Sequence, residues 1–61
     1  MTKGYAIAKE EAKKAILKYG IDNILNEHFT EIRERTGVSF IDLTNAFDYY
    51  RYSPKAAKYR V

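Results

Sequence analysis

The chain has 61 residues, of which 46% are hydrophobic, and it contains no cysteine. A chain of this length buries only about 60% of the surface that its unfolded form exposes, so we expect one domain, residues 1–61, with a thin core. The lack of cysteine excludes disulfides and argues against a structural zinc site. Hydrophobic content this high in so small a chain favours a homodimer or a complex with a partner.

No apolar run approaches the ~18 residues of a membrane span and no signal peptide begins the chain, so we expect a cytoplasmic protein without a membrane contact.

The net charge of +3 is unevenly distributed along the chain. Residues 1–50 carry seven basic and eight acidic side chains, whereas the last eleven residues carry four basic side chains and no acidic one. Four of the six tyrosines lie in or beside this basic end. The end therefore stands out as a candidate binding segment, with the basic residues Arg51, Lys55, Lys58 and Arg60 and the tyrosines Tyr49, Tyr50, Tyr52 and Tyr59.

Apolar residues recur at steps of three and four in the first segment and predict a helix over residues 4–19. Its buried stripe would consist of Tyr5, Ala8, Ala12, Ala15, Ile16 and Tyr19. Gly20 follows directly, and glycine adopts the left-handed conformation that ends many helices without steric cost.

A second helix is predicted over residues 22–36, with Asp22 as its N-cap. Its apolar face would contain Ile21, Ile24, Leu25, Phe29 and Ile32. Gly37 ends this helix as Gly20 ends the first.

The third helix is predicted over residues 39–52, and its start carries the clearest local signals. Ser39 is a good N-cap with Asp42 at N3, and Val38 and Leu43 are spaced as a hydrophobic staple. Its core stripe would be Phe40, Leu43, Phe47 and Tyr50. The helix should end near Tyr52 because a residue before proline avoids the α conformation.

Ser53 and Pro54 resemble a new helix start, so residues 54–60 form either a short basic helix or a tail. The predicted fold class is therefore all-α: a small three-helix bundle with a short basic C-terminal fourth helix or tail.

The segment 30–47 contains the connection Gly37-Val38-Ser39 between two predicted helices. It resembles the helix-turn-helix of bacterial and phage DNA-binding proteins, in which a glycine, a hydrophobic residue and a serine or threonine form the turn. Ile32 and Leu43 occupy the family's apolar core positions. The resemblance implies a small nucleic-acid-binding or regulatory protein, in which Thr44 and Asn45 contact bases and Ser39, at the helix start, lies near a phosphate. The alternative is that the three residues only connect two helices of a bundle.

The basic end offers a second route to nucleic acid. Arg51, Lys55, Lys58 and Arg60 would contact phosphates, and Tyr52 and Tyr59 would bond to phosphates or stack on unpaired bases. The alternative here is a helix end whose positive charge favours the helix dipole and whose tyrosines belong partly to the core.

A third hypothesis assigns the aromatic residues to a protein interface, since tyrosine and arginine are common in interface hot spots. Three short helices cannot bury all of Phe40, Ile41, Tyr49 and Tyr52. The chain would then be a small phage-type protein that inhibits or adapts a host protein through its aromatic and basic C-terminal surface. Exposure of Phe40 and Ile41 would favour this protein partner, whereas their burial would permit DNA reading by their neighbours.

No residue pattern indicates catalysis, a cofactor or a metal. Glu27, His28 and Glu31 share one helix face without a second ligand cluster, so we expect His28 to be solvated or half-buried and not a metal ligand. The chain has no cysteine nucleophile or glycine-rich phosphate loop, and Ser39 and Ser53 are explained as caps. We expect a protein that is not an enzyme.

Overall fold

The computed structural model describes residues 3–59 and shows an all-α protein, as predicted. Arg60, predicted to contact a partner, lies outside the described residues. The elements in chain order are α1 (Lys3–Tyr19), η1 (Ile21–Asn23), α2 (Asn26–Thr36), α3 (Phe40–Tyr52) and η2 (Pro54–Tyr59), where η denotes a 3₁₀ helix.

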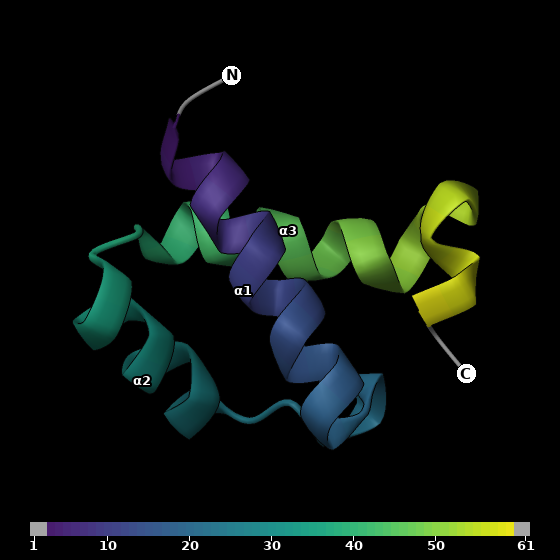
Figure 1. Ribbon diagram of the computed structural model, residues 1–61, viewed down its shortest axis with the longest axis horizontal. Coiled ribbons are helices and arrows are strands. Elements are labelled where there is room, and N and C mark those ends of the chain that lie inside the picture. Colours follow the sequence, from purple (N-terminus) through teal and green to yellow (C-terminus); the bar gives the residue numbers. More distant parts are fainter. Residues whose placement is uncertain (1–2, 60–61) are drawn as a thin grey trace.

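The two longest helices, α1 and α3, form the centre of the fold. Figure 1 shows α1 crossing α3, with α2 to one side and η2 at the C-terminal end of α3. Ala8 and Ala12 of α1 and Ala46 of α3 are completely buried. Because helix separation depends on the side chains at the contact, these alanines favour a close approach of the two backbones.

The core is small and lies between these helices and α2. Phe47 and Leu43 are its largest fully buried side chains, and Phe29 of α2 stacks on Phe47 with ring centroids 4.9 Å apart. The buried residues are Ala8, Ala12, Ala15, Ile16, Ile32, Val38, Leu43, Ala46, Phe47, Tyr50 and Ala56. The predicted stripes of the first and third helices therefore supply most of the core, although Phe40 and Tyr19 are exposed.

The prediction for the start of the second helix was wrong: α2 begins at Asn26 and not near Asp22. Ile21 and Ile24 pack against the core, and both Ile24 and Leu25 are extended, so the chain does not enter the helix until Asn26. The backbone N–H of Leu25 donates to Nδ1 of His28 at 2.9 Å. The histidine thus satisfies one backbone donor at the helix start, as the third helical residue does in a capping box. Leu25, predicted on the apolar face, is exposed.

The connection between α2 and α3 agrees with the prediction. Gly37 has φ 79°, and its N–H donates to the carbonyl oxygen of Arg33 at 2.8 Å, which closes α2. Val38 is buried, and the Ser39 hydroxyl accepts from the N–H of Asp42 at 3.1 Å. Three residues therefore end one helix, anchor the chain in the core and begin the next helix.

The segment after α3 folds as the short helix η2 through Tyr59, where the sequence left a helix or a tail open. The N–H of Ser53 donates to the carbonyl oxygen of Tyr49 at 3.0 Å, which closes α3. The Ser53 hydroxyl then accepts from the N–H of Lys55 at 3.3 Å, which opens η2. Ala56 is completely buried, so η2 is attached to the core.

Replacing Gly37 tests the left-handed turn. A Cβ at this position would meet no atom within 4 Å, so Gly37→Ala measures only the backbone conformation. We expect a loss of about 1–2 kcal/mol in the free energy of unfolding, measured by urea titration and circular dichroism. Gly37→Asn should lose less, because asparagine tolerates the left-handed region. Full stability of Gly37→Ala would show that this conformation is not required.

Candidate functional site

The side of α3 that points away from the core carries four residues in a line, Ile41, Asn45, Asp48 and Tyr52, which we call the outer face of α3. Their spacing of four, three and four residues keeps them on one side of a helix with 3.6 residues per turn. Ile41 is 70% exposed and Tyr52 is 74% exposed. Asn45 is exposed and Asp48 is half-buried. Two large hydrophobic side chains thus lie at the exposed ends of a row whose centre is polar.

Of the two residues predicted to contact bases, only Asn45 lies on the outer face of α3. Asn45 is exposed, but the hydroxyl oxygen of Thr44 is buried and has no hydrogen-bond partner among the described residues. The Thr44 hydroxyl is therefore not available to a base edge in this conformation. Ser39 is exposed, and its hydroxyl is used to cap α3.

The residues predicted as an exposed interface differ in their exposure. Phe40 is 50% exposed, with Phe29 and the Arg33 guanidinium each 5.7 Å from its ring centroid, and Ile41 is more exposed still. Tyr49 is half-buried, with the Lys9 Nζ 3.9 Å from its ring centroid. Exposure of Phe40 and Ile41 is the outcome that favours a protein partner.

Three of the C-terminal tyrosines pack against one another, and Tyr50, in the middle, is buried. The ring of Tyr50 makes edge-to-face contacts with Tyr49 and with Tyr59, each with centroids 5.2 Å apart. Burial raises the pKa of the Tyr50 hydroxyl. These rings attach η2 to α3, so Tyr59, a predicted contact residue, is half-buried, whereas Tyr52 is fully available.

The described basic residues of the C-terminal end lie at or near the surface. Lys55 and Lys58 are exposed, and Arg51 is half-buried. Within residues 3–59 none of these three forms an ion pair, whereas Lys13 pairs with Glu10. Their charges are therefore not neutralised locally.

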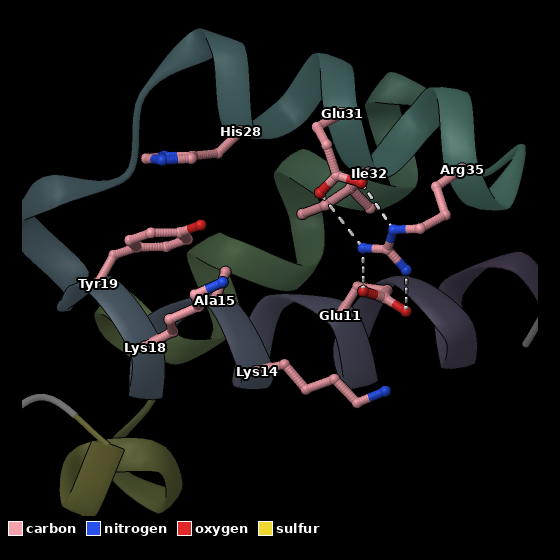
Figure 2. A pocket seen from close by; sticks show the side chains of 9 residues that line it. All are labelled: Glu11, Lys14, Ala15, Lys18, Tyr19, His28, Glu31, Ile32 and Arg35. Carbon is pink, nitrogen blue, oxygen red and sulfur yellow. Dashed lines mark hydrogen bonds and ion pairs between the residues drawn. The ribbon is translucent and has the colours of Figure 1, made fainter.

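A cleft of about 260 Å³ separates α1 from α2, and one arginine bridges it (Figure 2). Arg35 donates to both oxygens of Glu11, at 2.8 and 3.1 Å, and to Glu31 at 2.6 Å. These hydrogen bonds lower the pKa of both carboxyl groups and raise the pKa of the guanidinium. The lining residues are Glu11, Lys14, Ala15, Lys18, Tyr19, His28, Glu31, Ile32 and Arg35.

At the other end of the cleft, His28 stacks on Tyr19 with ring centroids 4.3 Å apart (Figure 2). Because Nδ1 of His28 accepts from Leu25, the neutral ring carries its proton on Nε2. His28 is half-buried, which is one of the two states that the sequence left open. Among the described residues no group of three or more potential ligands could hold a metal ion. Arg35 with Glu11 and Glu31 holds α2 against α1, and we call these three residues the clamp.

Sequence reasoning missed this clamp. Glu11 and Arg35 are 24 residues apart, and no local pattern relates them. The Glu31–Arg35 pair, in contrast, has the spacing of a favourable helical ion pair, and the structure contains it.

Comparison of the chain with family models, curated proteins and solved structures gave no match. Within residues 3–59, no helix combines the length and the apolar character needed to cross a bilayer.

The clamp predicts how stability depends on pH. The folded pKa of Glu11 lies below its ordinary value of 4.5, so its contribution is present above that value and is lost as the pH falls through the folded pKa. The free energy of unfolding should therefore fall less steeply for Glu11→Gln than for the wild type below pH 4.5. Denaturant titrations at stepwise lower pH measure both slopes. Glu34→Gln, at an exposed carboxylate of α2 that forms no ion pair within residues 3–59, should keep the wild-type slope. Identical slopes for Glu11→Gln and the wild type would contradict the clamp.

Proposed function

We propose that this protein is a non-catalytic protein-binding module and that the outer face of α3 is its binding surface. The observation that carries the proposal is the exposure of Ile41 and Tyr52 on the same side of one helix. Phe40 extends the apolar surface from the start of α3 toward α2.

The free energy gained by covering these apolar side chains supports a binding role for the outer face of α3. Covering an apolar side chain such as Ile41 contributes about 1.5–3 kcal/mol, and tyrosine is among the residues that most often dominate interface energies. Asn45 and Asp48, between them, supply a donor and an acceptor that fix the orientation of a bound partner.

The same face is poorly suited to reading DNA. Asp48 places a carboxylate where the phosphate backbone would approach, and Ile41 occupies the first turn, where base-contacting side chains are expected. The Thr44 hydroxyl is turned inward. These features favour a protein over a nucleic acid as the partner of α3.

Position-specific photo-crosslinking in cells tests this proposal. A photo-crosslinking amino acid in place of Ile41 or of Tyr52 should give a discrete crosslinked protein product. The same amino acid in place of Leu17, which is 68% exposed on α1, should not. Adding Ile41→Asp to the probe at position 52 should reduce the product at least tenfold. Equal crosslinking from positions 17 and 52 would contradict the proposal.

A second candidate function, nucleic-acid binding by the basic end, is supported by one separate observation. Lys55 and Lys58 of η2 are exposed and unpaired with any acidic group of residues 3–59, and Arg51 lies in the last turn of α3, just before η2. Such a cluster would contact phosphates without reading base sequence.

Salt-dependent binding distinguishes this second candidate. Fluorescence anisotropy of labelled duplex and single-stranded DNA would be measured across several salt concentrations. If both lysines contact phosphate, Lys55→Gln with Lys58→Gln should reduce the slope of log K against log salt by about 0.7–0.9 for each lost contact. Lys14→Gln with Lys18→Gln removes the same charge from α1 and should leave the slope unchanged. Nucleic-acid binding by the basic end would be contradicted if the wild type bound no DNA at low salt. It would also be contradicted if the two double variants changed the salt slope equally.

A further inference from the structure

We propose that the partner of the outer face of α3 is a second copy of this chain, bound with the two α3 helices antiparallel about a two-fold axis. The inference rests on the proposed function, because it names the partner of the same face. It follows from the order of the four residues along the helix.

The outer face of α3 is complementary to itself when one copy is reversed. The midpoint of the row lies between positions 46 and 47, and Ile41 and Tyr52 are equidistant from it. Asn45 and Asp48 are also equidistant from it. A two-fold axis through this point places Ile41 opposite Tyr52 of the second copy, and Asn45 opposite Asp48 of the second copy. A two-fold interface requires this property, because the same patch must bind itself.

Each of these pairs is chemically favourable. The Ile41 side chain would cover the ring of Tyr52, and symmetry repeats this contact at the other end of the row. The Asn45 side-chain amide can donate to the Asp48 carboxylate, so the polar centre would be hydrogen-bonded when water is excluded. The contact thus combines two apolar ends with a paired polar centre.

The spacing of the row also fits helix-on-helix packing. Steps of four, three and four residues are those of a coiled-coil seam, in which two helices present apolar positions to each other every 3.5 residues on average. A polar residue within such a seam specifies the register of the helices at a cost in stability. Asn45 and Asp48 would therefore select the antiparallel register.

The seam is accessible in the folded protein. The buried stripe of α3, with Leu43 and Ala46 at its centre, lies on the opposite side of the helix, facing the core. The row is about 16 Å long at 1.5 Å per residue, so the contact area is small. We therefore expect a weak dimer with a dissociation constant in roughly the micromolar range.

The first test is analytical ultracentrifugation of the purified full chain over a concentration series from roughly 10 to 500 µM. The wild type should pass from monomer to dimer over this range. Ile41→Asp should lower the association constant at least tenfold, because it places a charge in the apolar contact at both ends. Leu17→Asp is the matched control on α1, since Leu17 is nearly as exposed as Ile41, and it should not change association.

A charge exchange then tests the antiparallel register. Asn45→Asp alone would bring four carboxylates together at the centre, and Asp48→Lys alone would bring two ammonium groups together. Each variant should associate at least tenfold more weakly than the wild type. An equimolar mixture of the two should restore association, because the aspartate introduced at position 45 in one copy then faces the lysine introduced at position 48 in the other. Circular dichroism confirms that each variant remains folded.

The outcomes separate this inference from the proposed function. A mixture that fails to associate would overturn the antiparallel pairing, and a wild type that stays monomeric would overturn the dimer. If the wild type stays monomeric and positions 41 and 52 crosslink to a protein of another mass, the inference fails and the proposed function stands. If neither position gives a position-specific product, the proposed function fails as well. A crosslinked product of twice the chain mass supports both.

Discussion

The close packing of α1 against α3 is the constraint on which the rest of the structure depends. Ala8, Ala12 and Ala46 are completely buried, and side chains this small leave little volume between the helices. Within residues 3–59, Leu43 and Phe47 are the largest fully buried side chains, and many of the other buried residues are alanines, so the core is thin. A core this thin covers one side of α3 and leaves the other side to solvent. The exposed outer face is thus a direct consequence of how the core is built.

The small second helix depends on contacts of a different kind. Phe29 and Ile32 attach α2 to the core, and Arg35 joins it to α1 through carboxylates on both helices. Glu11 is only 12% exposed, so this ion pair is better shielded from water than an ordinary surface pair. Because α2 carries Phe29, which supports Phe40, the clamp also influences how the start of α3 is presented.

Helix ends that are determined by residues within about one turn could be predicted from the sequence. Gly37 and Ser39 act within a few residues of their own positions. The predicted end of α2 at Gly37 and the predicted start of α3 at Ser39 are both confirmed. The start of α2 was wrong because its cause is tertiary: Ile24 packs against the core in an extended conformation, and His28 supplies the acceptor that Asp22 was expected to supply. Which side of a helix meets the core depends on the other helices, so the inward hydroxyl of Thr44 could not be foreseen.

An α-helix with one apolar stripe can be stabilised within a monomer, but α3 has apolar residues on two sides. The inner stripe is buried, whereas Ile41 and Tyr52 remain in water. Large apolar side chains on a second side of a helix gain free energy when a further surface removes them from water. Among residues 3–59, the helices α1, α2 and η2 all contact α3, and they cover its inner stripe. The proposed binding partner would cover this outer face, and the symmetric order of its four residues makes an identical helix the simplest surface that fits.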